Sequence, residues 1–309
     1  MSLRDCIKLL LILCLLALVC FACREEEAVR ELEAKSADVN LSVRVAGYPK
    51  SGRTLIAIGG GPGLSSTYMT CLERLAGPNF CVVTYDQRGV GRSSAPSSYV
   101  ISYDMLDYVE DLEAVRRAVG TEKVHLLGHY WGGMIALYYA SLYPENVGSI
   151  VLYGGAPPAW DWMVDTSQRI VNRIVTLIEE GVIHIEDFPV GSSEWWREII
   201  RAYFSDPNFW FSPEEDVAPD YNYNVSQLTA KAIHEYDLTE IFAQVDHRVL
   251  ILFGQDDPAG RPVAVATKDA LLNADVKLVE FKKCGHFWQE CPDQFYPQIR
   301  DFLGLPSAP

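Results

Sequence analysis

Residues 123–133 read Lys-Val-His-Leu-Leu-Gly-His-Tyr-Trp-Gly-Gly, and this stretch decides the fold. Residues 123–127 predict a short strand, and the glycines that follow permit a sharp turn. The apolar residues 131–142 then predict a helix that begins directly after that turn. A strand that turns so tightly into a helix is typical of a mostly parallel sheet with helical connections.

The same alternation of strand and helix continues on both sides of this stretch, up to residue 155 and again from residue 248. In between, over residues 156–247, it stops, and Trp, Tyr, Phe and acidic residues become frequent. The pattern predicts an α/β fold, in which a mostly parallel sheet flanked by helices carries a helical insertion. The other expected strands cover residues 41–45 (at an edge), 54–58, 80–85, 149–153, 248–253 and 276–281, and the other expected helices cover 66–77, 103–119, 263–272 and 294–303.

The composition excludes several classes of protein. Of the 309 residues, 49% are hydrophobic and 22% are charged, so the chain can bury a sizeable core and is not disordered. The 26 Lys and Arg residues face 41 Asp and Glu residues, which gives a net charge of −15. A basic surface for nucleic acid is therefore missing, and anionic lipid headgroups would be repelled.

Three polar segments stand at the ends of predicted strands. They are Gly-His-Tyr-Trp-Gly-Gly at 128–133, Gly-Gln-Asp-Asp-Pro at 254–258 and Cys-Gly-His-Phe at 284–287. The first has the glycine spacing of a nucleophile elbow, G-x-S-x-G, and the other two supply an acid and a histidine in the order that such enzymes use. Two glycine-rich loops accompany them, Gly-Gly-Gly-Pro-Gly at 59–63 and Asp-Gln-Arg-Gly-Val-Gly-Arg-Ser at 86–93.

Together these segments resemble the proline iminopeptidase branch of the α/β-hydrolase fold superfamily. The resemblance covers residues 40–155 and 248–305 and is weak between them. It implies a core in two parts, residues 40–155 and 248–309, with a helical lid inserted at 156–247. It also implies a small-molecule or short-peptide substrate, cleaved at an N-terminal aminoacyl or prolyl amide bond or at a related ester bond.

The resemblance implies a role for individual residues. His286 would be the general base, and Asp257, rather than Asp256, would orient it. Asp86 and Arg88 match the family's second loop, where an internal ion pair is the common use, and we interpret them as scaffold. The oxyanion hole would consist of the backbone N–H groups of Trp131 and of Gly60 or Gly61.

The family also holds the free amino group of its substrate with acidic lid residues. Glu194 and Glu198 lie beside Trp195 and Trp196 in the expected lid, but neither can be matched to that motif.

The sequence departs from the family in two places. Gly59 stands where the family begins its glycine loop with His, and Tyr130 stands where the nucleophilic serine belongs. A phenol carries its oxygen a ring length further from the backbone than serine does, its ring fills the space for an acyl group, and its ordinary pKa is about 10. Ordinary serine-type acyl transfer is therefore not expected.

Three functions remain open at this point. In the first, the protein is a hydrolase-like enzyme in which His286 and Asp257 activate water, or in which Tyr130 acts as nucleophile or proton donor. In the second, it is a non-catalytic relative that binds a small ligand or peptide in the former active site. In the third, it is a surface-anchored partner protein whose pocket has no role. No metal-binding Cys spacing occurs, and neither a metal nor another cofactor is expected.

The N-terminus predicts export. Arg4 and Lys8 precede an apolar run over residues 9–22, which is too short for a bilayer span and has the length of a signal-peptide core. The run ends at Cys23 and resembles a bacterial lipoprotein signal, although Cys20 stands where that family favours Leu. We expect a signal peptide at 1–22, a lipidated Cys23 as membrane anchor, and a tether or short surface helix at 23–39. A simply cleaved signal and an uncleaved anchor are the alternatives.

Four cysteines follow the leader and Cys23. In an oxidising compartment two local disulfides are plausible, Cys71–Cys81 and Cys284–Cys291. The alternative is four reduced thiols buried as small apolar groups.

Overall fold

The computed structural model describes residues 29–48, 53–97, 103–211 and 218–306. The predicted signal peptide and Cys23 lie outside these ranges. Within them, no helix is long and apolar enough to cross a membrane.

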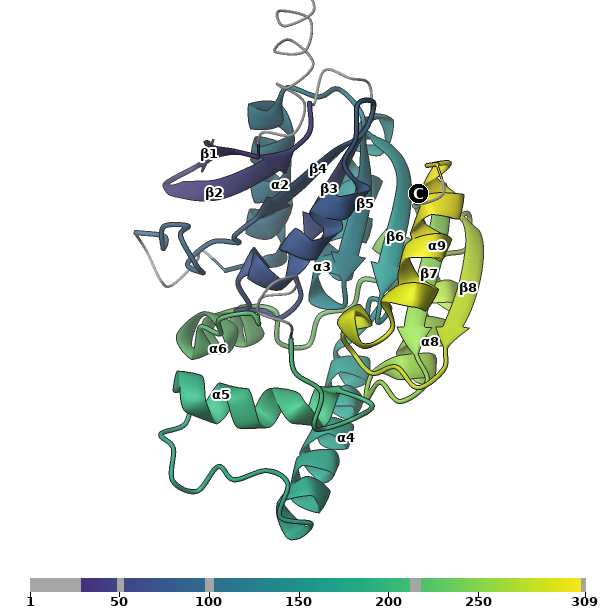
Figure 1. Cartoon of the computed structure of the whole chain (residues 1–309). Helices are drawn as coiled ribbons and strands as arrows, with labels where there is room; N and C mark the ends of the chain where they lie inside the picture. Colours follow the sequence, from purple (N-terminus) through teal and green to yellow (C-terminus); the bar gives the residue numbers. More distant parts are fainter. Residues whose placement is uncertain (1–28, 49–52, 98–102, 212–217, 307–309) are drawn as a thin grey trace, which may run out of the picture.

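An eight-stranded sheet in the order β1-β2-β4-β3-β5-β6-β7-β8 forms the centre of the molecule (Figure 1). The pairs β1–β2 and β2–β4 are antiparallel, and all other neighbours are parallel. This mostly parallel sheet with flanking helices confirms the predicted fold class. The strands are β1 (Arg30–Ser36), β2 (Val39–Ala46), β3 (Thr54–Ile58), β4 (Cys81–Tyr85), β5 (Val124–His129), β6 (Val147–Tyr153), β7 (Arg248–Gly254) and β8 (Asp275–Phe281).

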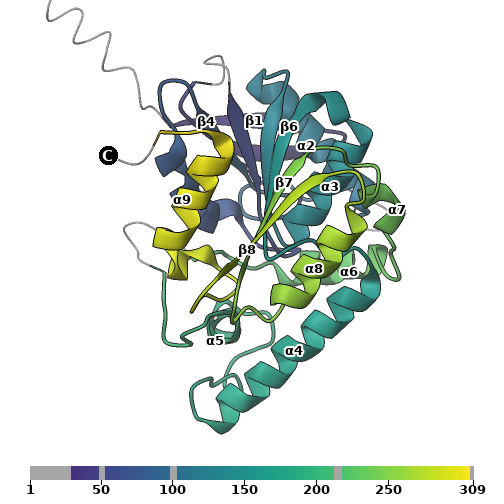
Figure 2. The same cartoon turned by 90° about the vertical axis from the view of Figure 1, so that its right-hand side faces the viewer.

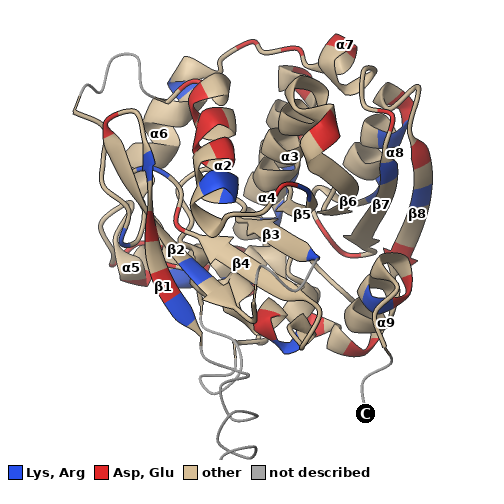
Figure 3. Ribbon diagram, turned by 90° about the horizontal axis from the view of Figure 1, so that it is seen from above, with Lys and Arg blue, Asp and Glu red and all other residues tan. Residues whose placement is uncertain are grey.

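Helices cover both faces of the sheet, and Figure 3 shows α2, α3 and α8 together on one side of it and α9 on the other. Strand β3 is buried at every position, because Ile56 and Ile58 belong to the apolar cluster under α2 and α3 while Leu55 and Ala57 belong to the cluster under η2 and α9. The flanking elements are the 3-10 helix η2 (Ser66–Leu75), α2 (Met105–Val119), α3 (Trp131–Leu142), η3 (Pro144–Asn146), α8 (Gly260–Ala270), η5 (Trp288–Glu290) and α9 (Pro292–Leu303).

The remaining helices lie between β6 and β7, within the predicted insertion. In Figures 1 and 2 all but the last of them stand beyond the end of the sheet to which the arrowheads of β6, β7 and β8 point. These helices lie over the carboxyl ends of the parallel strands, where this kind of sheet places its ligands, whereas the short last helix, residues 239–242, packs against α3 and α8. The helices between β6 and β7 are α4 (Trp160–Glu179), α5 (Ser193–Ile199), η4 (Ile200–Tyr203), α6 (Tyr223–Ala232) and α7 (Thr239–Phe242).

Three local predictions were wrong. Residues 30–36 form strand β1, which pairs with β2, instead of part of a tether or surface helix. In this strand Leu32, Ala34 and Ser36 are partly or fully buried and alternate with exposed charged residues. Strand β2 is consequently covered on one edge by β1 and is not itself the edge strand. The predicted helix after the glycine loop is a ten-residue 3-10 helix.

One of the two proposed disulfides is present. Cys284 and Cys291 are joined, with their Cα atoms 5.8 Å apart, whereas Cys71 and Cys81 are not bonded to each other. Cys71 packs in the apolar cluster under η2, and Cys81 packs in the cluster on the opposite face of the sheet. The sheet itself separates these two thiols, which sequence spacing cannot reveal.

We expect the double variant Cys284→Ala/Cys291→Ala to lower the free energy of unfolding by about 2 kcal/mol, because the bridge closes a short loop. Denaturant unfolding measures this loss. A reductant should produce the same loss in the native protein and leave the double variant unchanged. Unaltered stability of the native protein after complete reduction, verified by thiol counting, would contradict a stabilising bridge.

Candidate functional site

The structure brings Asp257 and His286 together at the carboxyl ends of β7 and β8. Nδ1 of His286 lies 2.9 Å from Oδ1 of Asp257, whose side chain is fully buried. Oδ1 also accepts the Ala259 N–H at 2.8 Å, which fixes the carboxylate. Asp256 is exposed and instead accepts the Ser205 hydroxyl at 2.7 Å. Asp257, as predicted, and not Asp256 is the partner of the histidine.

Tyr130 occupies a sharp turn between β5 and α3. Its backbone angles, φ 47° and ψ −96°, lie in a region that bulky residues rarely adopt. The surrounding glycines make the turn possible, since a Cβ on Gly128 would lie 2.5 Å from the Gly132 carbonyl oxygen and one on Gly132 would lie 2.2 Å from that of Ile58. The strand-turn-helix of a nucleophile elbow is thus retained around a residue that is not serine.

The Tyr130 side chain meets His286 through its ring and not through its oxygen. The two rings pack edge to face with centroids 5.3 Å apart. The phenol oxygen is buried and has no hydrogen-bond partner in the described part of the chain. Burial raises the pKa of Tyr130 above its ordinary value, and the nearby Thr166 hydroxyl offsets this only in part. Tyr130 is therefore a neutral phenol beside the histidine.

A buried hydrogen-bond chain through His129 joins the glycine loop to the His286 segment. The Gly60 N–H donates to the Tyr68 hydroxyl at 2.6 Å, which lies 2.8 Å from His129 Nδ1, while His129 Nε2 lies 2.9 Å from the His286 carbonyl oxygen. Since a carbonyl only accepts, Nε2 carries the proton and Nδ1 accepts from Tyr68. Burial and the nearby His286 imidazole hold the pKa of His129 well below its ordinary value, so the ring is neutral.

The hydrogen bond from Gly60 to Tyr68 removes one of the predicted oxyanion-hole donors. The Gly60 N–H is engaged by Tyr68, so of the two loop glycines only Gly61 still has the predicted role open to it. Trp131 is the first residue of α3, and its N–H has no carbonyl partner within the helix. Sequence reasoning missed both Tyr68 and His129. The available signal was the glycine at position 60, because a Cβ there would lie 2.8 Å from His129 Nδ1.

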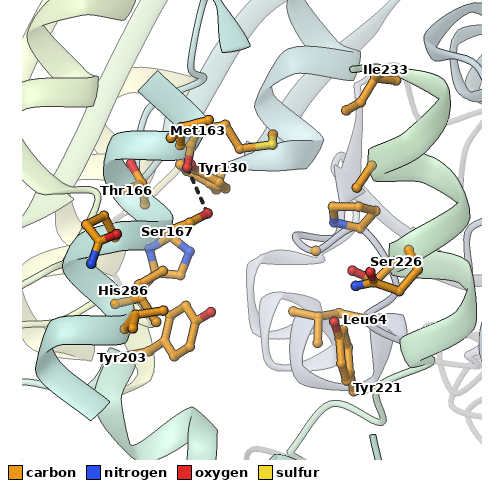
Figure 4. A pocket seen from close by; sticks show the side chains of 18 of the residues that line it. Leu64, Tyr130, Met163, Thr166, Ser167, Tyr203, Tyr221, Ser226, Ile233 and His286 are labelled. Atoms are coloured by element: carbon orange, nitrogen blue, oxygen red, sulfur yellow. Dashed lines mark hydrogen bonds between the residues drawn. The ribbon is translucent and has the colours of Figure 1, made fainter. Parts of the chain in front are cut away.

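A cavity of about 530 Å³ lies over Tyr130 and His286, under the inserted helices. Figure 4 shows Met163, Thr166 and Ser167 of α4 along one wall, and Ser226 of α6 on the opposite wall. The cavity is also lined by Tyr130 and His286, two of the three predicted catalytic residues, and by Gly61 of the glycine loop, while Asp257 contacts His286 without lining the cavity. The site therefore keeps the general arrangement of an active-site pocket.

Two other predicted groups lie outside this cavity. Asp86 and Arg88 do not pair with each other: Asp86 accepts the Ser66 and Arg92 backbone N–H groups at 2.8 and 2.9 Å, while Arg88 is bidentate to Asp111 at 2.7 and 2.8 Å. Both are scaffold contacts.

The acidic residues of α5 also face away from the cavity. Glu198 accepts the His184 N–H at 3.0 Å and pairs with Arg201 at 3.2 Å, and Glu194 is exposed. Neither residue lines the cavity.

Known proteins resemble this chain along most of its length. A family model described as alpha/beta hydrolase fold matches residues 53–179. A proline iminopeptidase from Clostridium botulinum is 34% identical over 256 residues, which cover 77% of this chain and 85% of the relative, and one from Lactobacillus crispatus is 27% identical over 288 residues, which cover 84% and 93%. The crystal structure of proline iminopeptidase from Mycobacterium smegmatis superposes with a TM-score of 0.65 at 19% identity and covers 89% of this chain and 98% of that one. The chain belongs to the proline iminopeptidase-like branch of the α/β-hydrolase fold superfamily.

Proposed function

We propose that this protein binds a small ligand in the cavity above His286 and forms no covalent acyl-enzyme, although it keeps the fold of its hydrolytic relatives. The observation that carries the proposal is the position of the Tyr130 hydroxyl, which is buried near Thr166 and makes no hydrogen bond to His286. A nucleophile must have its proton within hydrogen-bond reach of the base.

The hydrogen bond of His286 and the raised pKa of Tyr130 support the same proposal. Asp257 engages Nδ1 of His286, which leaves Nε2 to act as the base. Because burial raises the pKa of Tyr130, the phenol does not ionise near neutral pH without such a base. The tyrosine ring also stands where the acyl group of a substrate would have to sit.

A second candidate function rests on the 2.9 Å contact between His286 and Asp257. This pair could activate a water molecule directly. The water oxygen would bond to a substrate carbonyl carbon while one of its protons passes to Nε2. The bond between that carbon and the leaving group would then break, and Nε2 would give its proton to the leaving group. The carbonyl oxygen would accept from the N–H groups of Trp131 and Gly61.

Two measurements on the native protein test the proposal. We expect 2-acetylnaphthalene, a ketone that cannot be hydrolysed, to raise the thermal midpoint of the native protein but not of Ala230→Trp, which fills the cavity. We also expect no hydrolysis of 2-naphthyl acetate or prolyl-p-nitroanilide above the rate in buffer. Turnover that disappears in both His286→Ala and Asp257→Asn would instead establish the water-activating pair, and an unchanged midpoint would exclude the binding function.

We also propose that the protein acts outside the cytoplasm, attached to a membrane through a lipidated Cys23. The apolar leader at 9–22 and the Cys284–Cys291 disulfide support this location, since disulfides persist in oxidising compartments. Cys23→Ser should move the protein from the membrane fraction to the soluble fraction. Retention of this variant in the membrane would show that lipidation is not the anchor.

A further inference from the structure

We propose that the cavity takes an uncharged aromatic carbonyl compound, such as an ester, ketone or blocked amide, whose carbonyl oxygen accepts hydrogen bonds from Tyr130 and Thr166, and that it rejects peptides with a free amino terminus. The inference rests on the ligand-binding function proposed above. It gives Tyr130 a role as a hydrogen-bond donor to the ligand in place of the lost nucleophile.

The cavity wall lacks carboxylate, ammonium and guanidinium groups among the described residues. Of the described residues that line it, none is Asp, Glu, Lys or Arg. The three charged groups that act on the tyrosine do not line the cavity: Asp257 is hydrogen-bonded to His286, and Asp165 and Arg169 on α4 pair with each other at 2.8 Å. An ammonium group that enters such a cavity loses its hydration and finds no carboxylate to replace it, which costs several kcal/mol.

Two buried hydroxyl groups of the cavity have no hydrogen-bond partner among the described residues. The side chains of Tyr130 and Thr166 both line it, are 8% and 2% exposed, and have oxygens without a hydrogen-bond partner in the described part of the chain. Figure 4 shows the two side chains on the same wall of the cavity. A buried hydroxyl without a partner is costly, and a ligand acceptor between the two would satisfy both.

The next hydroxyl on α4, that of Ser167, differs from these two because it is already hydrogen-bonded. Ser167 also lines the cavity, but it donates to the Met163 carbonyl at 2.8 Å, the bond drawn in Figure 4. Its hydrogen is therefore already used within the helix. Of the described hydroxyl groups that line the cavity, those of Tyr130 and Thr166 are the two that are buried without a hydrogen-bond partner, so we assign the acceptor subsite to them.

The rest of the cavity suits an aromatic body. Trp160, Trp196, Tyr203, Tyr221 and Phe287 contribute rings to its wall. Flat rings of this kind bury aromatic ligands well, with edge-to-face and offset-stacked contacts. The ligand class that fits is thus apolar and aromatic, with one carbonyl.

The decisive test uses two ligands that differ in one charge. Prolyl-2-naphthylamide has a free ammonium, and N-acetyl-prolyl-2-naphthylamide does not. We expect calorimetry to give at least tenfold tighter binding of the acetylated compound to the native protein. The variant Gln227→Glu, which adds one carboxylate of the same shape to the cavity wall, should reduce that ratio. Equal or tighter binding of the free amine to the native protein would overturn the inference.

The hydroxyl subsite has its own test. Tyr130→Phe and Thr166→Val should each weaken binding of 2-acetylnaphthalene about threefold to tenfold and leave naphthalene, which has no acceptor, unchanged. Thr176→Val is the matched control, since its hydroxyl donates to the Asn172 carbonyl on the exposed side of α4. Unweakened ketone binding in both variants would refute the subsite while leaving ligand binding itself intact. If 2-acetylnaphthalene fails to bind the native protein at all, the proposed function fails as well.

Discussion

Tyr130→Ser is expected to hydrolyse 2-naphthyl acetate at least about 100-fold faster than the native protein, because general-base activation of a serine contributes on this scale. The small hydroxyl would stand on the same strained turn, φ 47° and ψ −96°, close to the backbone and beside His286. Removing the tyrosine ring also opens room for the acyl group. Release of 2-naphthol, followed by fluorescence, measures the rate.

Two controls separate a new nucleophile from a larger cavity. Tyr130→Ala removes the ring without supplying a hydroxyl and should remain inactive. The double variant Tyr130→Ser/His286→Ala should lose the gain, because the serine would have no base. If Tyr130→Ala is as active as Tyr130→Ser, the hydrolysis comes from water activated by His286 and Asp257, and the lost nucleophile is not what limits the native protein.

Asp111→Ala is expected to lower the free energy of unfolding by about 3–5 kcal/mol, since it leaves a buried guanidinium without its carboxylate. Arg88 is 2% exposed and Asp111 is 1% exposed, and two hydrogen bonds of 2.7 and 2.8 Å join them. Arg88 would keep its weaker contact to the Asp107 carboxylate, at 3.4 Å, its hydrogen bond to the Asp107 carbonyl oxygen and its position over the Tyr108 ring, none of which replaces the buried carboxylate. Denaturant unfolding followed by circular dichroism measures the loss.

The same helix supplies the control for this pair. Glu110→Ala removes an exposed carboxylate that accepts the Tyr143 hydroxyl, and it should cost less than about 1 kcal/mol. Replacing both buried charges, in Arg88→Met/Asp111→Leu, should recover most of the stability. A loss for Asp111→Ala no larger than that for Glu110→Ala would show that the buried pair does not stabilise this fold.

Much of the sheet could be predicted from the sequence because its central strands are short apolar runs between turn residues. The bounds of β3 and α3 match their predictions, and the ends of β7 and β8 place Asp257 and His286 together. Strand β1 was missed because its charged residues are frequent enough to suggest a solvated helix. The alternation of buried and exposed residues along it becomes apparent only when β1 pairs with β2.

The site was predicted less completely because its details depend on contacts between distant segments. Gly60 and His129 are linked through Tyr68, and His129 reaches the His286 carbonyl across 157 residues of sequence. No local pattern reveals that one predicted oxyanion donor is occupied in this way. Likewise, the edge-to-face packing of the Tyr130 ring on His286 and the burial of its hydroxyl without a partner in the described part of the chain depend on contacts that no local pattern reveals.

Reaction with phenylmethanesulfonyl fluoride shows directly whether the Tyr130 hydroxyl of the native protein is an activated nucleophile. This reagent sulfonylates an activated hydroxyl and releases fluoride, so an intact-mass measurement counts the nucleophiles. The native protein is expected to show no adduct, because the Tyr130 phenol is buried, neutral and not hydrogen-bonded to His286. Tyr130→Ser is expected to gain one adduct that disappears when His286 is also replaced. A single adduct on Tyr130 of the native protein would show that the tyrosine is an activated nucleophile, and the proposal that the protein forms no acyl-enzyme would be wrong.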